Sequence, residues 1–424
     1  MHYITAVPSQ KDNHMDQHKL YRTIKALAEE KFRTEEQLLA SVLERIIENE
    51  EIPIKGGRIW KLEPSSGTYR IIRQFGEMEG IEKNFRIRIL DYPLFLQLPK
   101  KGTIVGTETN KYLRRKGIKL YSATGIGEKV IWKNYSLFPY VIAINADYMK
   151  HDMTYALNII SNSLTTVLEN RHIETKAKQL EQDLDKAREI QKSILPEHEL
   201  KFHHYELYGI SVPDRVVGGD FFDYLQASGD KTRLVVVIGD AASKGLSAAA
   251  QALYVSGALR LGIEYQTKTG SFIGKINQLV HKTFQTEHFI SMVYAELTDS
   301  DKGLVFYVNA GHSNPILLHQ GTDEVEFLRA TGQMLGPFPN EKYRSEYAFM
   351  AKGDVLLLYT DGITEASNEK HEMYGEQRLI RKLKEHRSKT PREICQLLIE
   401  DVQVHNRLTE YSDDKTMVLV KRTR

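Results

Sequence analysis

Carboxylates interrupt apolar segments of this sequence at four places, each where a strand would meet a loop. They are Asp220 and Asp223 in VVGGDFFDY, Asp240 at the end of LVVVIGD, Asp361 at the end of DVLLLYTDG, and Asp413 and Asp414 in YSDDKTMVLV. A buried carboxylate is unfavourable unless it is paired, hydrogen-bonded or bound to a metal. No matching set of Lys or Arg stands at equivalent strand ends. Any one of these acids, taken alone, is also typical of a turn or helix cap.

Oxygen ligands without Cys or His are typical of sites for hard divalent cations such as Mg2+ or Mn2+. Small residues surround Asp240 in IGDAASKG, and they leave room for backbone carbonyls and water. Two such ions can hold a hydroxide and a phosphoryl oxygen for in-line phosphoryl displacement. The pattern therefore predicts a metal centre for phosphoryl chemistry, although spacing alone does not bring these acids together.

The elements that must position these acids follow from the hydrophobic pattern of the C-terminal half. Strands are expected in HYELYGISV, LVVVIGD, SMVYAELT, LVFYVNA, PILLH, DVLLLYTDG and KTMVLVKR. Helices are expected over residues 246–260, 271–285, 375–386 and 391–407. Many strands with few βαβ alternations favour a largely antiparallel sheet system flanked by helices.

Motifs in the same half resemble the metal-dependent PPM (protein phosphatase 2C) class, in its bacterial SpoIIE/RsbU-like branch. They are REIQKSILP, RVVGGDFFD, IGDAASKG, NAGHSNP, LGPF, GDVLLLYTDGITEA, YGEQRL and DDKTMVLV. Their order and spacing together are specific, and the resemblance covers nearly all of residues 198–424. It implies an antiparallel β-sandwich with helices on both outer faces. It also implies hydrolysis of phosphoserine or phosphothreonine in proteins.

The resemblance assigns roles to individual residues. Asp240 resembles the acid that bridges two ions, Mn2+ or Mg2+. Asp361 and Asp413 look like ligands of the first ion, and the backbone carbonyl of Ala241 would serve the second. Asp220 resembles the acid that holds metal-bound water. The implied mechanism is direct attack by a metal-activated water, without a covalent enzyme intermediate.

Three further residues have weaker or structural interpretations. Arg215, five residues before Asp220, resembles a basic residue that meets the substrate phosphate, and an ordinary surface arginine is an equal alternative. Asp223 and His312 are expected to be structural. Because the mechanism uses water, no cysteine nucleophile is needed.

The N-terminal half carries a different pattern. Residues 1–18 are polar and are expected to be flexible, and a helical pattern follows over 20–49. Strand patterns in GRIWKLEP, TYRIIRQF, GEKVIWKNYS and YVIAINAD then precede a helix over 154–170. This order is similar to a GAF domain, a bacterial sensor module that resembles PAS. We therefore expect an α/β sensor domain over 19–170, with a small-molecule or protein signal.

A heptad seam follows the sensor half. Its spacings are four, three, four and three, and its residues are Ile173, Ala177, Leu180, Leu184 and Ala187. The seam predicts a helical coiled-coil linker over 171–197, ended by Pro196, and a homodimer. The alternative is one long surface helix packed on its own domain. With either arrangement of the linker, residues 198–424 are expected to form the phosphatase domain, and the whole chain is expected to be α+β.

Net charge, cysteine count and hydropathy argue against several classes of protein. A net charge of +2, from 58 basic and 56 acidic residues, argues against a dedicated nucleic-acid binder. One cysteine, Cys395, allows neither an intramolecular disulfide nor a Cys-based zinc site. The sequence shows no signal-peptide pattern and no apolar run of about 18 residues that could span a membrane. A cytoplasmic location is expected.

The leading hypothesis is a metal-dependent serine/threonine phosphatase regulated through its sensor and linker. By resemblance, its substrate would be a small phosphorylated regulatory protein of the anti-sigma-factor-antagonist type. The alternative is a catalytically weak pseudo-phosphatase or signalling scaffold that binds a phosphorylated partner. The reason for this alternative is Ser243 in DAASKG, where the family more often has Gly.

Overall fold

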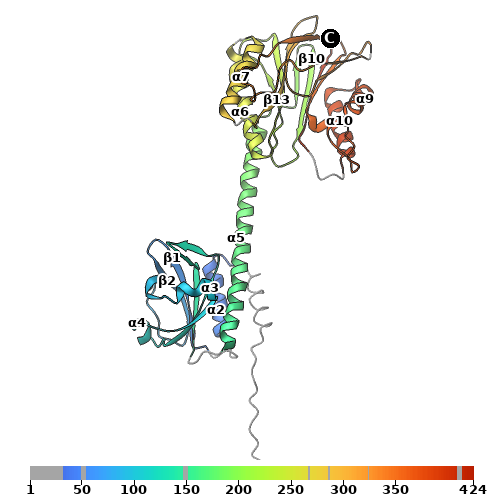
Figure 1. Cartoon of the computed structure of the whole chain (residues 1–424). Coiled ribbons are helices and arrows are strands. Elements are labelled where there is room, and N and C mark those ends of the chain that lie inside the picture. The colour runs from blue at the N-terminus through green and yellow to red at the C-terminus, as the bar shows by residue number, and fades with distance from the viewer. Residues whose placement is uncertain are drawn as a thin grey trace, which may run out of the picture. The chain divides into compact units, whose positions relative to one another are not determined.

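In a computed structural model, the chain forms two compact units, Met1–Gln179 and Leu180–Arg424 (Figure 1). The structure describes residues 32–48, 54–146, 151–265, 268–284, 287–322, 324–407 and 413–424. The segment 1–18, expected to be flexible, lies outside them. None of the helices within these residues is long and apolar enough to cross a membrane.

The N-terminal unit is built on a six-stranded antiparallel sheet in the order β3-β2-β1-β8-β5-β4. The strands are β1 (Gly56–Glu63), β2 (Thr68–Gly76), β3 (Arg86–Arg88), β4 (Thr103–Thr107), β5 (Leu120–Ile126) and β8 (Tyr140–Asn145). The predicted β1–β2 hairpin is confirmed. Its turn ends at Gly67, which has a φ of +65°, a conformation that glycine adopts without steric cost.

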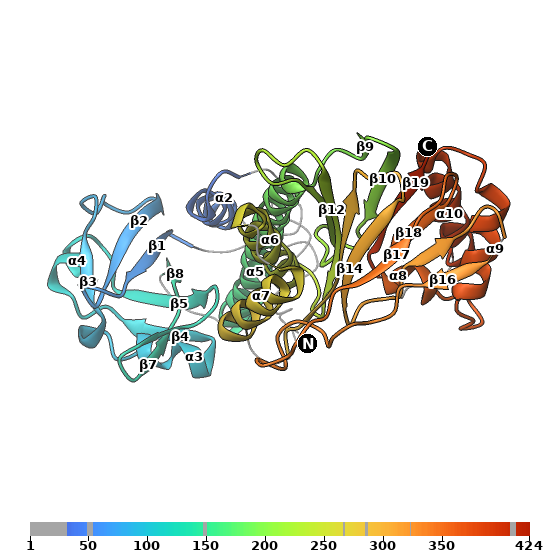
Figure 2. The same cartoon turned by 90° about the horizontal axis from the view of Figure 1, so that it is seen from above.

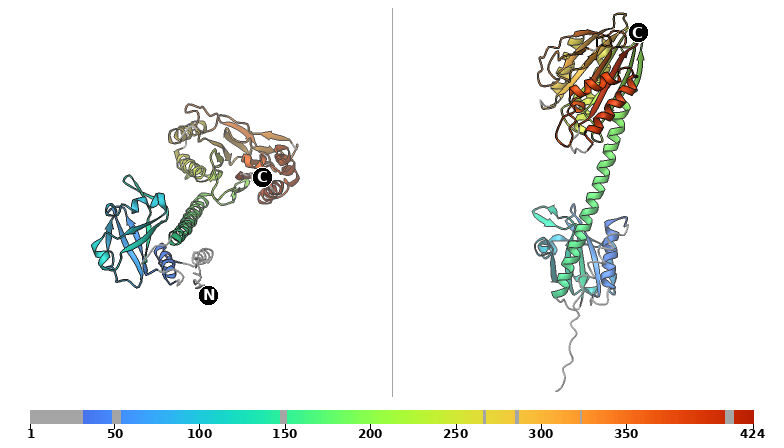
Figure 3. Two further views of the ribbon diagram at one scale, coloured as in Figure 1. Left: turned by 60° about the horizontal axis from the view of Figure 1, so that its bottom comes forward. Right: turned by 90° about the vertical axis from the view of Figure 1, so that its right-hand side faces the viewer.

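Helices cover one face of this sheet, and short elements cover the other. Helix α2 (Glu35–Ile47) begins at Thr34, whose hydroxyl accepts the Gln37 N–H. It packs beside the first part of helix α5 (His151–Ile194) on the same side of the sheet, as Figure 3 shows. The opposite face packs against residues of η1 (Ile89–Asp91), η2 (Phe95–Gln97), α3 (Leu98–Lys101), α4 (Lys111–Arg115) and β7 (Tyr135–Leu137).

Two predictions for this unit need correction. The helical pattern over 20–49 does not extend through residues 32–34, because Thr34 caps the helix; residues 20–31 and 49 lie outside the described ranges. The single strand predicted in GEKVIWKNYS is wrong. It folds as a separate hairpin of β6 (Val130–Trp132) and β7, which turns at Lys133 with a φ of +52°.

Helix α5 joins two segments that the sequence pattern separates. The predicted helix over 154–170 and the heptad seam belong to one helix of 44 residues, which ends at Ile194, two residues before Pro196. Leu157 and Leu168 are buried in the N-terminal unit. In the seam, Ile173 and Leu180 are 64% and 61% exposed. The same helix therefore changes from a core element to an apolar stripe that is exposed at Ile173, Ala177 and Leu180 and part-buried at Leu184 and Ala187.

The C-terminal unit contains two antiparallel sheets. One has the order β16-β15-β18-β19-β10-β9, formed by β9 (Glu199–Phe202), β10 (Tyr205–Val212), β15 (Ile316–Leu318), β16 (Val325–Phe327), β18 (Val355–Tyr359) and β19 (Lys415–Arg422). The other has the order β11-β12-β13-β14-β17, formed by β11 (Phe221–Leu225), β12 (Arg233–Ala241), β13 (Ile290–Thr298), β14 (Leu304–Ala310) and β17 (Glu346–Phe349).

The two sheets pack face to face, with helices on both outer faces (Figure 2). Helices α6 (Leu246–Gly262) and α7 (Thr269–Thr283) cover the five-stranded sheet, and α9 (Glu376–His386) and α10 (Pro391–His405) cover the other. Strand β12 alternates between two cores: Val236 and Ile238 lie between the sheets, whereas Val235 and Val237 pack under the helices. The predicted antiparallel sandwich flanked by helices is confirmed.

Candidate metal centre

Two antiparallel strand pairs bring the four predicted acids to one end of the sandwich. In the five-stranded sheet, the start of β11 pairs with the end of β12, which places Asp220 beside Asp240. In the other sheet, the end of β18 pairs with the start of β19, which places Asp361 near Asp413. Because the sheets face each other, the two pairs of carboxylates approach across the end of the core.

Most of the predicted site residues line one cavity of about 270 Å3. Asp240, Asp361 and Asp413 contribute carboxylates, and Ala241 and Arg215 also lie in its wall. The remaining lining residues are Asp214, Val217, Ala242, Ser243, Lys244, Gly245, Phe289 and Asp414. The structure therefore brings together residues separated by up to 200 positions in the chain, from Asp214 to Asp414.

Asp220 is not in the wall of the cavity but is buried close to it, at 4% exposure. The Thr360 hydroxyl donates to its Oδ2 at 2.7 Å, and the Thr416 N–H donates to the same hydroxyl at 3.0 Å. Burial and then the charges of Asp240 and Asp414 raise the pKa of Asp220 well above its ordinary value. Thr360 thus fixes the orientation of this carboxyl group.

The carboxylates of the cavity raise one another's pKa values. Burial and then the charges of Asp361, Asp413 and Asp414 raise the pKa of Asp240 to about 7. Burial and then Asp413 raise the pKa of Asp361. Such crowding of oxygen donors suits a divalent cation, which would compensate the repulsion. The donor set, carboxylates with a backbone carbonyl, fits Mn2+ or Mg2+.

The acids do not form a closed coordination shell by themselves. Among the described residues, no three His, Cys, Asp or Glu side chains are grouped tightly enough to hold an ion. One carboxylate, Asp413, instead faces a cation of the chain, with Lys244 Nζ 3.2 Å from its Oδ2. The ammonium group therefore neutralises part of the charge that an ion would otherwise compensate.

Asp414 is a further carboxylate in the wall of the cavity, and the sequence motif assigned it no role of its own. Its carboxylate accepts backbone N–H groups of Asp214 at 2.8 Å, of Gly219 at 2.6 Å and of Asp220 at 3.4 Å. A Cβ at Gly218 would overlap this carboxylate, which explains a glycine there. The sequence indicates a role for Asp414 only through the two consecutive acids of DDKT. That pair does not show which of the two acids binds the loop that leads to Asp220.

The loop after Asp240 is short and tightly held. Ala241 is buried, and Gly245, with a φ of +68°, ends the loop and begins α6. Gln251 of α6 donates from Nε2 to the Ser243 hydroxyl at 2.7 Å. The residue that departs from the family pattern is therefore tied to the helix that follows it.

Three other titratable residues, Asp223, His312 and Cys395, are not in the wall of the cavity. Asp223 is buried and pairs with Arg260, Nε to Oδ2 2.6 Å. His312 is buried, with Nδ1 2.7 Å from the Ser291 hydroxyl, and burial lowers its pKa to about 4. Burial raises the pKa of the Cys395 thiol. These positions agree with the structural roles expected for Asp223 and His312.

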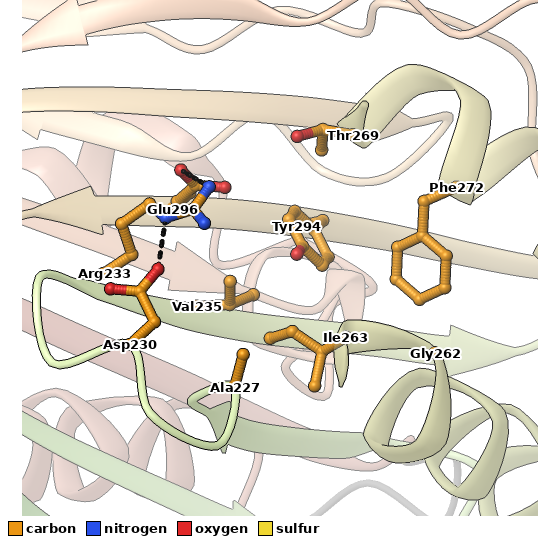
Figure 4. A pocket seen from close by; sticks show the side chains of 10 residues that line it. All are labelled: Ala227, Asp230, Arg233, Val235, Gly262, Ile263, Thr269, Phe272, Tyr294 and Glu296. Carbon is orange, nitrogen blue, oxygen red and sulfur yellow. Dashed lines mark hydrogen bonds and ion pairs between the residues drawn. The ribbon is translucent and has the colours of Figure 1, made fainter. Parts of the chain in front are cut away.

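A second, smaller cavity lies at the opposite end of β12 (Figure 4). It holds about 40 Å3, enough for a few water molecules and not for a phosphorylated side chain. Its arginine, Arg233, is paired with Asp230 at 2.7 Å and lies 3.5 Å from Glu296. Because that charge is already satisfied, this cavity is not the candidate site.

The metal-free chain is expected to lose stability as pH rises, because of Asp240. Its pKa is about 7 in the folded chain and about 3.9 in an unfolded one. The folded state therefore holds more protons between these values, and the free energy of unfolding falls from about pH 4 to about pH 7. We expect Asp240→Asn to be more stable than the wild type at pH 7.5 in EDTA, with a difference that shrinks towards pH 4. Chemical denaturation at both pH values measures this, and a difference independent of pH would contradict it.

Comparison with known proteins finds relatives of the C-terminal half of the chain. The model of the family described as "Stage II sporulation protein E (SpoIIE)" matches residues 230–423. Protein IcfG of Synechocystis sp. is 28% identical over 266 residues, which are 57% of this chain and 41% of IcfG. Phosphoserine phosphatase RsbU of Bacillus subtilis is 23% identical over 280 residues, which are 64% of this chain and 79% of RsbU. The chain thus spans about two fifths of the length of IcfG.

A solved structure agrees on the fold. The SiaA-PP2C domain of Pseudomonas aeruginosa superimposes with a TM-score of 0.51 at 20% identity. The match covers 59% of this chain and 99% of that domain. The residues that match the SpoIIE model lie inside Leu180–Arg424, so the C-terminal unit of this chain resembles SpoIIE/RsbU-like domains of the PPM phosphatase family.

Proposed function

We propose that the chain is a metal-dependent serine/threonine protein phosphatase whose C-terminal site holds two Mn2+ or Mg2+ ions. The observation that carries the proposal is the meeting of Asp240, Asp361 and Asp413 in one cavity, each from a different strand end. The raised pKa values of Asp240 and Asp361 support a site in which a bound cation would stabilise the ionised carboxylates. Similarity to a phosphoserine phosphatase supports the reaction class.

The proposed roles follow from the position of each side chain. Asp240, Asp361, Asp413 and the Ala241 carbonyl would hold the ions, which when bound would activate a water molecule and neutralise phosphoryl charge. Asp220, oriented by Thr360, would accept a hydrogen bond from water at the buried side of the site. Arg215 lines the cavity and would meet the anionic phosphate of the substrate.

Phosphate release by the intact chain tests this proposal. The assay uses a phosphoserine or phosphothreonine peptide with Mn2+, Mg2+ or EDTA. We expect release with Mn2+ or Mg2+ and none in EDTA. Release that is equal in EDTA would contradict metal dependence, and no release with either metal would favour the binding alternative below.

The second candidate is a pseudo-phosphatase that binds a phosphorylated partner without turnover. The observation that favours it is the bond from Gln251 to the Ser243 hydroxyl, which stiffens the loop that carries Ala241. Calorimetric titration with Mn2+ separates the two. Binding that is lost in Asp240→Ala, together with absent turnover in the wild type and recovered turnover in Ser243→Gly, would support the second candidate.

The substrate we propose is a small phosphorylated regulatory protein of the anti-sigma-factor-antagonist type. Its support is the similarity to RsbU over 79% of the RsbU length. We also propose a GAF-like sensor over 19–170, a linker over 171–197 and a phosphatase domain over 198–424. The six-stranded antiparallel sheet with α2 and α5 on one face supports the first of these assignments.

The exposed seam of α5 supports a parallel coiled-coil homodimer through the linker. An apolar stripe that stays exposed in one chain is stabilised when a second helix covers it. We expect the double variant Leu180→Asp with Leu184→Asp to halve the mass measured by light scattering and to change the phosphatase activity. The matched control, Lys178→Asp with Gln182→Asp, adds the same acids beside the seam and should keep the dimer. An unchanged mass in the seam variant would remove the linker from the proposal.

A further inference from the structure

A buried arginine lies in the centre of the N-terminal unit. Arg58 is in β1, between β2 and β8 in the sheet, and is 1% exposed. Its side chain is on the face opposite α2 and α5, together with Trp60 of the same strand. A guanidinium group keeps its charge at neutral pH, so burial without a counter-charge is costly.

The guanidinium group is only partly satisfied. Nη2 donates to Asn145 Oδ1 at 2.8 Å. Nε and Nη1 have no hydrogen-bond acceptor among the described residues, which leaves three of the five N–H bonds without a partner. Burial lowers the pKa of Arg58 to about 10, so the group is still charged near pH 7. Buried donors of this kind are rarely left empty in folded proteins.

The nearest acid does not pair with it. Glu108 is 2% exposed, and its Oε1 accepts the Tyr92 hydroxyl at 2.7 Å and the Asn110 N–H at 2.9 Å. The charge of Glu108 raises the pKa of Arg58 and so opposes the effect of burial. The described residues nevertheless contain no ion pair or hydrogen bond between the two side chains. Glu108 is thus already held by other donors, and the Arg58 donors remain available.

The surroundings indicate what kind of molecule would use these donors. The Trp60 ring lies 5.9 Å from Arg58 Cζ, and the aromatic side chains of Tyr69, Tyr92, Phe95 and Tyr121 belong to the same buried cluster. An aromatic cluster favours an organic body, and the guanidinium N–H groups without acceptors favour an anionic group.

We propose that Arg58 anchors a ligand site in the N-terminal unit for a small organic anion, whose carboxylate or phosphate oxygens accept the free guanidinium N–H groups. This site goes beyond the proposed phosphatase activity. The bound anion would be the signal to which the N-terminal unit responds. Its test measures binding and not turnover, so it can fail or succeed whatever the C-terminal site does.

The test uses the intact chain in EDTA, with acetate, benzoate and inorganic phosphate as probes. Calorimetry and thermal unfolding measure binding to the wild type, to Arg58→Met and to Arg73→Met. Arg73 is an exposed arginine of the neighbouring strand β2 and serves as the matched control. We expect at least one probe to bind the wild type and Arg73→Met equally, and Arg58→Met about thirtyfold more weakly or worse. Preference for acetate and benzoate identifies a carboxylate site, and preference for phosphate identifies a phosphate site.

The unfolding temperature of Arg58→Met without a probe distinguishes a ligand site from a structural charge pair. If Arg58 awaits a ligand, Arg58→Met removes a buried charge without an acceptor and should unfold no earlier than the empty wild type. A large drop in the unfolding temperature of Arg58→Met, or its failure to fold, would mean that Arg58 and Glu108 form a water-bridged structural pair and would overturn the proposal. Absence of binding by all three probes, or equal binding by Arg58→Met, would overturn it too.

Discussion

Asp240→Asn is expected to lower Mn2+-dependent phosphate release by about a thousandfold or more, since metal ions contribute several kcal/mol to phosphoryl transfer. Asp240 ends the strand that lies at the centre of the site, and its neighbours include Asp220, Asp361 and Asp413. An amide in its place cannot supply the negative charge that two cations would share. Phosphate release at saturating Mn2+ is the measurement.

The control for this prediction is Asp223→Asn. Asp223 is another buried acid, three residues after Asp220 and within β11, but it pairs with Arg260 and accepts a hydrogen bond from Ser256 on the helix side of the sheet. We expect this variant to keep its Mn2+ dependence and most of its turnover. If Asp240→Asn keeps turnover within about tenfold of the wild type, the proposed role of Asp240 is wrong.

The two consecutive acids Asp413 and Asp414 should respond in opposite ways to replacement. Asp414 accepts three backbone N–H groups of the loop that leads to Asp220. Asp414→Ala leaves these donors without their charged acceptor, and we expect the free energy of unfolding to fall by about 2 kcal/mol or more. Asp413 is half-exposed, and its Oδ2 lies 3.2 Å from Lys244 Nζ. For Asp413→Ala we expect a change within about 1 kcal/mol.

Phosphate release by the same two variants is the second part of this comparison. Asp413→Ala should lose phosphate release by about a hundredfold or more while it remains folded, because the proposed first ion loses a carboxylate. Denaturant unfolding in EDTA and phosphate release in Mn2+ are measured on both variants. A stable, inactive Asp414→Ala beside an unstable, active Asp413→Ala would reverse the assignment and make Asp414 the ligand.

The C-terminal fold could be predicted because its strands are strongly apolar and antiparallel. Strand β12 is a continuous apolar run because Val235 and Val237 face the helices while Val236 and Ile238 face the other sheet. Alternating strand directions then place acids at the end of one strand next to acids at the start of its neighbour. The strand-end positions of the four carboxylates could therefore be predicted, whereas their meeting in one cavity also depends on how the two sheets pack.

The parts that escaped prediction depend on contacts that no local pattern records. Asp414 is distinguished from Asp413 only by backbone donors about 200 positions earlier in the chain. Thr360 orients Asp220 across the two sheets. In the N-terminal unit, the β6–β7 hairpin was read as one strand because a non-glycine residue, Lys133, makes its turn. The buried Arg58 had no signal, since a charged residue within a strand usually faces solvent.

The central claim is that Asp240, Asp361 and Asp413 meet in order to hold metal ions. An anomalous difference map from crystals of the intact chain in saturating Mn2+ tests it most directly. We expect two peaks in the cavity, both in contact with Asp240, with Asp361 and Asp413 on one of them and the Ala241 carbonyl on the other. A cavity without Mn2+ at saturation, or Mn2+ bound elsewhere and away from Asp240, would contradict it.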